Sequence, residues 1–304
     1  MNGLTLNNLK SPSQIFNAEG ILFFPRLFEG EELERLLAAC NHVLDQFLFE
    51  VDNPEALEGC EVRQPGLHEP TVDGNRNVYR MHHLNDPKWF EEHGEYWNFI
   101  MEAAADPRCL GPVEQVFRGE SLFRGTSLFF NPRLESSEGD WHRDVQFVVP
   151  DEEAVKRYFA ELNSTGVESF NGIQLQIALI ETDDIEYVPF SCSRYDSPEE
   201  FHIRCADLRS HNRESGMPNA MRIHQRPGDA LIFNANGLHR GRYHVERPRR
   251  TLMYTYTKRD SIFRDYFSDQ PWLLKKGILD SLSPRCQAYF RSFIDEYRDY
   301  WSRK

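Results

Sequence analysis

The chain has 304 residues and a formal net charge of −13 with neutral histidines, from 35 Lys+Arg against 48 Asp+Glu. With 40% hydrophobic and 27% charged residues, it has the composition of a globular protein long enough to bury a sizeable core. Because this acidic balance comes without a dense Lys/Arg block, we expect neither duplex nucleic acid nor an anionic membrane as the main partner.

Targeting and redox signals are absent from the sequence as read. The longest apolar runs, such as residues 21–24, are too short to cross a bilayer, and residues 1–14 lack the layout of a signal peptide. The six cysteines are scattered with no close pair, which favours neither a disulfide framework nor a zinc knuckle. We therefore expect a soluble cytoplasmic protein, and the sequence leaves its oligomeric state open.

The first part of the chain is predicted to be helical. Residues 31–49 carry apolar side chains at the spacing of an amphipathic helix, and Glu31 and Glu32 suit its N-terminus. Asp86 and Pro87 are typical of a second helix start, with the helix running toward Met101. Residues 51–80 are rich in Pro, Gly and Asn and are predicted to form a loop.

The middle of the chain predicts short strands separated by Pro, Gly and Asn, a pattern typical of a barrel or jelly roll. The predicted strands are 121–130, 141–149, 172–180, 185–190, 221–225, 229–233 and 251–258. A predicted helix at 151–162 interrupts them, and a last helix begins at Ser283–Pro284.

These elements predict a mainly β fold with flanking α-helices, in one domain. We expect a helical N-terminal part at about 14–118, a β-core at about 121–258 and C-terminal helices at about 260–304. The insertion 151–171 follows a candidate site strand and contains a Ser-Thr-Gly segment, so it is either a lid over the site or a surface helix.

Three side chains have the pattern of a metal site. His142 and Asp144 lie two residues apart, so on a strand they point to the same face. His239 follows 95 residues after Asp144, near the end of another strand. Two imidazoles and one carboxylate form the facial triad of non-haem Fe(II) oxygenases, which leaves coordination positions open. Taken alone, His142 and Asp144 could equally be a surface pair.

A candidate anion anchor lies downstream. Arg250 comes eleven residues after His239 and opens the predicted strand 251–258. Its guanidinium can form a two-pronged pair with the far carboxylate of 2-oxoglutarate. Arg249 is the rival for this role, since strand alternation lets only one of the two face inward.

Together these motifs resemble the phytanoyl-CoA dioxygenase family of Fe(II)/2-oxoglutarate-dependent oxygenases over roughly residues 14–260. The motifs that carry the resemblance are Phe16–Gly20, Trp141–Asp144, Pro227–Asp229, His239 and Arg250. The resemblance implies a double-stranded β-helix (a cupin-like jelly roll), with His142, Asp144 and His239 as catalytic metal ligands. It also implies that Arg250, whose spacing it favours over Arg249, binds 2-oxoglutarate, assisted by Asn131.

The chain also departs from the family pattern. Phe190–Arg194 replaces a frequent Gly-Ser-His, and Gly241 replaces a serine that often contacts 2-oxoglutarate. Asp144 is retained, which argues against the related halogenases, where a small residue takes its place.

Further candidates line the same predicted core. Gln174 and Gln176 alternate with apolar residues, so they face either the barrel interior, where they could contact cosubstrate or substrate, or solvent. Arg143 is a candidate substrate contact or an outward salt bridge. Tyr79, Arg80 and His82 precede the second helix and are candidates for substrate binding, although a His pair such as 82–83 is more often structural.

The implied function is an Fe(II)- and 2-oxoglutarate-dependent dioxygenase that uses dioxygen, releases succinate and CO2, and takes ascorbate as reductant in assays. Hydroxylation of an unactivated C–H bond is the expected outcome. Arginines near the predicted pocket suggest a small anionic metabolite or amino-acid-like substrate: Arg63, Arg76, Arg80 and Arg143. The alternatives are a non-catalytic metal-binding sensor or scaffold, and a zinc hydrolase with the same triad.

Overall fold

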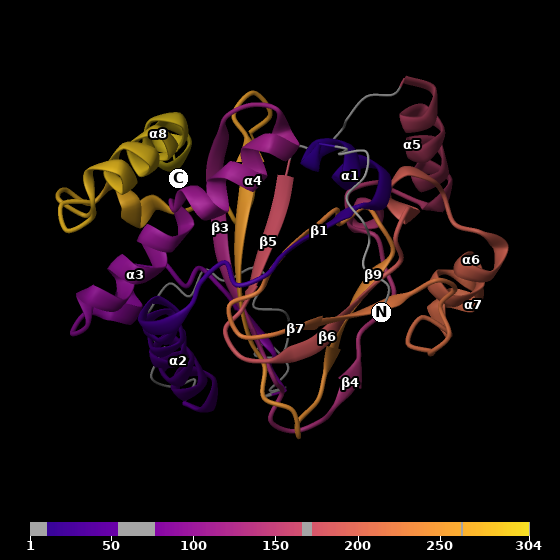
Figure 1. Cartoon of the computed structure of the whole chain (residues 1–304), viewed down its shortest axis with the longest axis horizontal. Coiled ribbons are helices and arrows are strands. Elements are labelled where there is room, and N and C mark those ends of the chain that lie inside the picture. Colours follow the sequence, from indigo (N-terminus) through magenta and orange to yellow (C-terminus); the bar gives the residue numbers. More distant parts are fainter. Residues whose placement is uncertain (1–10, 54–76, 166–171, 263, 304) are drawn as a thin grey trace.

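The computed structural model describes residues 11–53, 77–165, 172–262 and 264–303. Two β-sheets occupy the centre of the molecule, and helices flank them on both sides (Figure 1). The larger sheet has the order β1 (Ile21–Phe24), β8 (Ala230–Phe233), β5 (Gly172–Ala178), β10 (Arg250–Lys258), β3 (Ser121–Phe130) and β2 (Arg80–His82). The smaller sheet has the order β4 (Ser137–Glu138), β9 (His239–Tyr243), β6 (Thr182–Tyr187) and β7 (Met221–Gln225).

Neighbouring strands in both sheets are antiparallel, which confirms the mainly β prediction. The predicted strands 121–130 and 221–225 have those bounds in β3 and β7. The prediction of a strand at 141–149 is wrong, because only His142 pairs, through an isolated bridge to His239, and the chain then turns into η3 (Asp144–Phe147). The sequence analysis also missed β1, which lies within the part predicted to be helical.

The helices flank the sheets in two groups. Those of the first group lie toward the left in Figure 1: α2 (Gly30–Asp52), α3 (Gly94–Ala104), α4 (Pro107–Phe117) and α8 (Pro284–Trp301). The second group lies toward the right: α5 (Glu152–Thr165), α6 (Pro198–Arg204) and α7 (Ala206–Arg209). The remaining helical elements are α1 (Pro12–Glu19), η2 (Pro87–Phe90), η4 (Ser191–Ser193) and η5 (Pro271–Leu274). The second predicted helix is thus divided into η2 and α3.

The main hydrophobic core lies between the larger sheet and the first group of helices. Leu252, Tyr254 and Tyr256 of β10 belong to this core and are fully buried. The hydroxyl groups of the two tyrosines donate to the carbonyl oxygens of Ile100 and Ala104 in α3. The face of β10 that carries these even-numbered residues is therefore its outer face, and the odd-numbered residues point toward the smaller sheet.

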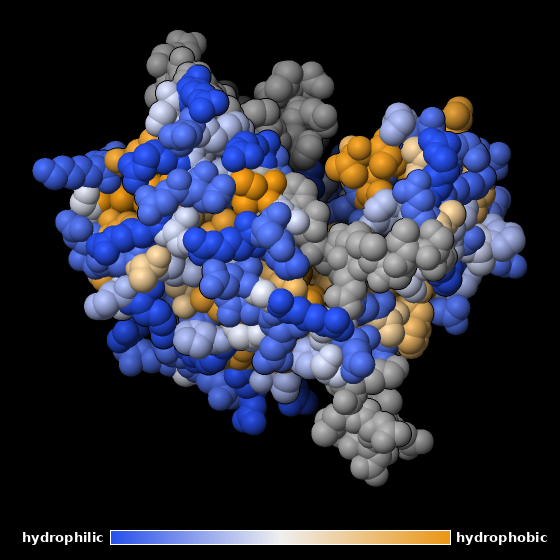
Figure 2. Space-filling view, turned by 90° about the horizontal axis from the view of Figure 1, so that it is seen from above, coloured by the Kyte–Doolittle hydropathy of each residue, from blue (hydrophilic) through white to orange (hydrophobic). Residues whose placement is uncertain are grey.

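Hydrophilic residues cover most of the face shown in Figure 2, where apolar residues gather in small separate groups. Within the part of the chain that the structure describes, no helix is long and apolar enough to span a membrane.

Candidate active site

The two histidines and the aspartate singled out in the sequence lie together. His142 and His239 face each other across the isolated bridge, and each backbone N–H donates to the other residue's carbonyl oxygen at 3.1 Å. Asp144 begins η3, and its backbone N–H donates to the carbonyl oxygen of Ala235. One ligand atom from each of His142, Asp144 and His239 lies within 4.8 Å of the other two.

Both imidazole rings are oriented by the backbone. The Nδ1 atom of His142 donates to the carbonyl oxygen of Asp140 at 2.7 Å, and that of His239 donates to the carbonyl oxygen of Gly237 at 2.9 Å. Because Nδ1 is the donor in each ring, Nε2 is the atom that is left to bind a metal. Both Nε2 atoms lie 3.7 Å from the same oxygen, Oδ1 of Asp144. Such backbone bonds commonly orient histidines that bind metals.

The electrostatics of these groups suit a cation. Burial lowers the pKa of His239 well below its usual value, and the neighbouring His142 lowers it further, so this imidazole is neutral. Burial raises the pKa of Asp144, against the opposing effect of His142, Arg124, Gln174 and Arg80. A divalent cation would favour the charged carboxylate. Two neutral imidazoles and one carboxylate are a donor set that fits Fe(II), and also Zn(II).

The two glutamines of β5 face the barrel interior and not solvent. Gln174 donates from Nε2 to Oδ2 of Asp144 at 3.3 Å. Gln176 lies one pleat further along and is only 4% exposed. Its Nε2 approaches the sulfur of Met253 at 3.8 Å, and its Oε1 is buried without a hydrogen-bond partner among the described residues. A buried amide oxygen with no partner is costly unless a bound molecule satisfies it.

The structure contradicts the prediction that Arg250 points into the site. Arg250 lies on the outer face of β10, where its Nε donates to Oδ1 of Asn41 in α2. Arg249 lies between the two sheets instead, with its guanidinium 5.1 Å from the ring centroid of Phe129 in β3 and 5.4 Å from that of Tyr243 in β9. Arg249 and Arg250 therefore face opposite ways, as strand alternation requires of adjacent residues.

Arg249 has the features of an anion anchor. Its side chain is 3% exposed, and its Nε donates to Oγ1 of Thr251 and lies 3.8 Å from a carboxylate oxygen of Asp184. Its Nη1 is buried and has no hydrogen-bond partner within the described ranges. A buried cationic donor of this kind needs an acceptor, and a carboxylate is the acceptor that suits a guanidinium best.

Asn131, which the resemblance implied to assist in binding 2-oxoglutarate, serves the start of β10 instead. Its Oδ1 accepts from Nη1 of Arg250 and from the backbone N–H of Arg249, so it fixes the start of β10. The space that a side chain at position 241 would occupy is taken by Tyr243. A Cβ atom on Gly241 would lie 2.6 Å from the Tyr243 hydroxyl, so the missing side chain leaves room for this phenol beside Arg249. Burial raises the pKa of Tyr243, which keeps it a hydrogen-bond donor.

The β2 segment borders the same interior. Arg80 and His82 pair with Phe129 and Ser127, so they share the inner face of the larger sheet. Tyr79 packs on Tyr243 with ring centroids 4.0 Å apart. His82 is buried, with Nδ1 2.7 Å from the Ser127 hydroxyl and its ring against Phe267, which argues against the predicted substrate contact. Arg80 is half-buried and forms no ion pair with any residue of the described ranges.

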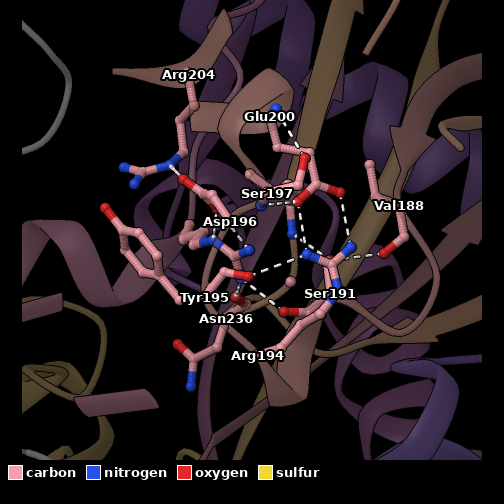
Figure 3. A network of polar contacts seen from close by, with 12 residues as sticks. Val188, Ser191, Arg194, Tyr195, Asp196, Ser197, Glu200, Arg204 and Asn236 are labelled. Carbon is pink, nitrogen blue, oxygen red and sulfur yellow. Dashed lines mark hydrogen bonds and ion pairs between the residues drawn. The ribbon is translucent and has the colours of Figure 1, made fainter. Parts of the chain in front are cut away.

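Arg143 does not meet the prediction of substrate contact. Its side chain is fully buried and forms an ion pair with the equally buried Asp196 at 2.7 Å. The extended backbone of Arg143, with φ −128° and ψ 133°, turns its side chain away from its two neighbours, His142 and Asp144. Arg143 therefore belongs to an interior polar network with Asp196 and Arg204, both labelled in Figure 3, and not to a substrate pocket.

The sequence analysis also missed Phe147. This side chain is 65% exposed, yet its ring lies 5.5 Å from the ring of His142. Phe147 follows Asp144 by only three residues, and this proximity could have indicated a place beside the site. The incorrect prediction of a strand at 141–149 hid the turn that brings Phe147 back to His142.

Comparisons with known proteins bear on the fold and on the class of the site. No family model matches the chain. Over 261 residues it is 23% identical to an ectoine dioxygenase of Halomonas elongata, covering 81% of this chain and 69% of that protein. The crystal structure of EctD from S. alaskensis with 2-oxoglutarate and 5-hydroxyectoine has a TM-score of 0.51 and 15% identity, covering 86% of this chain and 81% of that chain.

A second solved structure, the non-haem α-ketoglutarate-dependent carbocyclase SnoK from nogalamycin biosynthesis, has a TM-score of 0.51 and 17% identity, and covers 93% of this chain and 95% of that chain. This chain has the fold of the Fe(II)/2-oxoglutarate-dependent oxygenases. The prediction of a double-stranded β-helix with flanking helices is confirmed.

Proposed function

We propose that this chain is an Fe(II)- and 2-oxoglutarate-dependent dioxygenase that hydroxylates a C–H bond of a small anionic molecule. The observation that carries the proposal is that a candidate metal site and a candidate carboxylate site both lie between the two sheets. His142, Asp144 and His239 bring three ligand atoms together, and the buried Nη1 of Arg249 has no hydrogen-bond acceptor among the described residues. The relative named ectoine dioxygenase, and the EctD structure that contains 2-oxoglutarate, support this reaction class.

Each residue has a defined task in this proposal. The Nε2 atoms of His142 and His239 and the carboxylate of Asp144 hold the iron. Gln174 donates to Oδ2 of Asp144, which leaves Oδ1 facing both imidazoles. Arg249 and the Tyr243 hydroxyl bind the far carboxylate of 2-oxoglutarate. Bound iron and 2-oxoglutarate activate dioxygen, with one oxygen atom going to succinate, alongside CO2, and the other to the hydroxyl group of the product.

The two alternative functions require only some of these residues. A metal-binding sensor and a zinc hydrolase both require the triad, but neither requires a buried dicarboxylate anchor. Arg249, Tyr243 and the unpartnered Gln176 amide oxygen favour a second bound molecule beside the metal.

Succinate formation from 2-oxoglutarate under air, with Fe(II) and ascorbate, tests the reaction class. The wild-type chain should release succinate, and Asp144→Ala should lose at least a hundredfold of that rate because the triad loses its anionic ligand. Asp140→Asn is the matched control, because this exposed carboxylate pairs with Arg213 and only the backbone carbonyl of residue 140 contacts His142. Equal rates for the wild type and Asp144→Ala would refute the proposal.

The anionic substrate is the finer part of the proposal and rests on Arg80. Arg80 shares the inner face of the larger sheet, opposite Phe129, and it forms no ion pair within 4 Å with a carboxylate of the described residues. One guanidinium, from Arg249, serves 2-oxoglutarate, which leaves Arg80 for a carboxylate of the substrate. Phe147, exposed beside His142, offers an apolar contact for the carbon skeleton. Arg63 and Arg76 lie outside the described residues.

A screen of carboxylate metabolites for substrate-stimulated succinate release would identify the compound class. For the compound found, Arg80→Met should raise KM about 10- to 100-fold, the effect of losing one charge-assisted pair. The KM for 2-oxoglutarate should stay the same. The methyl ester of the compound should not distinguish the variant from the wild type, and an unchanged KM for the free acid would refute this role.

A further inference from the structure

Two segments carry the proposed metal ligands: His142–Asp144 is the first ligand segment, and residues 236–239, which end at His239, are the second. Arg143 lies between the two ligands of the first segment and has an unusual environment. Arg143 has 0% side-chain exposure, yet it carries a full charge. Burying a charge is expensive unless it is paired and hydrogen-bonded. Three groups meet this need: the carboxylate of Asp196 and the backbone carbonyl oxygens of Ser191 and Asn236.

These acceptors connect the two proposed ligand segments. Nη1 of Arg143 donates at 2.7 Å to the carbonyl oxygen of Asn236, three residues before His239. The same nitrogen donates at 2.7 Å to the carbonyl oxygen of Ser191, whose hydroxyl accepts from the backbone N–H of Leu238 at 2.7 Å. One guanidinium therefore ties the segment of His142 and Asp144 to the residues on which the position of His239 depends.

A second arginine continues the network to helix α5. Asp196 is 0% exposed and lies between Arg143 and Arg204, whose Nε donates to its Oδ2 at 2.6 Å (Figure 3). Arg204 also pairs with Glu152 in the first turn of α5. The ring of Phe159, further along α5, lies 4.7 Å from the guanidinium carbon of Arg143. The described part of the predicted lid is thus docked on the ligand segment.

Buried ion pairs contribute little net stability, because the desolvation of both charges offsets their attraction. A guanidinium does, however, fix direction, since its planar fork holds several acceptors in one arrangement. We infer that Arg143 is a positioning residue that sets the metal affinity of the site by holding the two ligand segments in register. This inference rests on the proposed function, since it concerns the same three ligands.

The test compares two arginines of the same cluster. Arg143→Met removes the link between the ligand segments and leaves the buried Asp196 with one partner fewer. Arg194→Met is the matched control, because it deprives the equally buried Glu200 of its guanidinium at 2.6 Å. The Arg194–Glu200 pair, also drawn in Figure 3, lies at the start of α6 and touches neither ligand segment.

Calorimetric titration with Co(II) in the absence of air measures metal affinity without turnover. We expect Arg143→Met to weaken Co(II) binding about 10- to 100-fold, the range found when groups that orient metal ligands are removed. Arg194→Met should stay within about threefold of the wild type. Arg143→Lys keeps the charge but not the fork, so its affinity should fall between those of Arg143→Met and the wild type.

The outcomes separate the two claims. Wild-type-like Co(II) binding by Arg143→Met, or an equal loss in Arg194→Met at a similar loss of thermal stability, would overturn the positioning role alone. If Co(II) binding by the wild type is absent, or is unchanged in Asp144→Ala, the proposed function itself is refuted. Should Arg143→Met not fold, Asp196→Asn weakens the same link with a smaller change, and an unaltered affinity in that variant would also overturn the inference.

Discussion

The two faces of strand β10 differ in what their side chains do. On the outer face, Leu252, Tyr254 and Tyr256 are buried against the helices, and the tyrosine hydroxyls are satisfied by backbone carbonyls. On the inner face, Arg249, which directly precedes β10, and Gln176 of the adjacent strand β5, opposite Met253, each keep a buried polar atom without a partner among the described residues. The tyrosine hydroxyls named on the outer face have hydrogen-bond partners within the protein, whereas the inner face carries buried polar atoms that could still bond to a ligand.

This difference shows where a bound molecule is expected. Native proteins rarely leave buried donors and acceptors unpaired, so the unpaired atoms of Arg249 and Gln176, on the same inner face as the Gln174 that contacts Asp144, are candidate contacts for a bound molecule. The same comparison decides between the two adjacent arginines, because Arg250 contributes to the packing against α2 and Arg249 to the interior.

The largest expected effect comes from a substitution on the outer face of β10. Leu252 is 0% exposed within the main core, so Leu252→Ala should lower the free energy of unfolding by about 2–5 kcal/mol. Metal affinity of the folded variant should remain close to that of the wild type. Chemical denaturation and Co(II) titration measure the two quantities. A loss of metal affinity in the folded Leu252→Ala protein would show that the two faces are not independent.

A smaller effect is the contribution of His83 to the pH dependence of stability. His83 follows the inward-facing His82 at the end of β2, and its ring packs against Tyr266 and Trp272. Burial lowers the pKa of His83 to about 4 from 6.5. The unfolded chain then binds more protons than the folded chain between these values, so stability is full above pH 6.5 and falls as the pH drops toward 4.

This depressed pKa should cost on the order of 1–2 kcal/mol of stability between pH 7 and pH 5. Denaturation at both pH values should show that His83→Gln removes this part of the dependence. If the variant keeps the whole slope, His83 is not its source.

The smallest effect sharpens the inner face. Gln176→Leu replaces a buried amide whose oxygen lacks a described partner, so it should leave stability unchanged or raise it by about 1 kcal/mol. The same change should impair the binding of 2-oxoglutarate or substrate, measured as a rise in KM. A destabilised variant with normal kinetics would mean that the amide serves the fold and not the site.

Much of this architecture could be predicted from the sequence. The alternating patterns gave β3 and β7 with their observed bounds, and the spacing of His142, Asp144 and His239 anticipated that they lie together. These features are local, or follow from a family resemblance that does not depend on a single-residue shift.

The remaining features depend on tertiary context. Period-two alternation states that Arg249 and Arg250 face opposite ways, but the phase is set by the packing of β10 against α2. The role of Arg143 arises from contacts with Asp196 and Asn236, which are distant in sequence, and that of Tyr243 from packing that places its ring beside Arg249. The N-terminal strand β1 was missed because four apolar residues between helices carry little periodicity.

The central claim is that the inner face, through Arg249, holds the cosubstrate. Equilibrium binding of 2-oxoglutarate to Co(II)-loaded protein without air, compared between Arg249→Met and Arg250→Met, tests it most directly. We predict that Arg249→Met weakens binding on the order of 100-fold, from the loss of charge-assisted hydrogen bonds, while Arg250→Met stays within about threefold. Loss of binding in Arg250→Met together with normal binding in Arg249→Met would contradict the account.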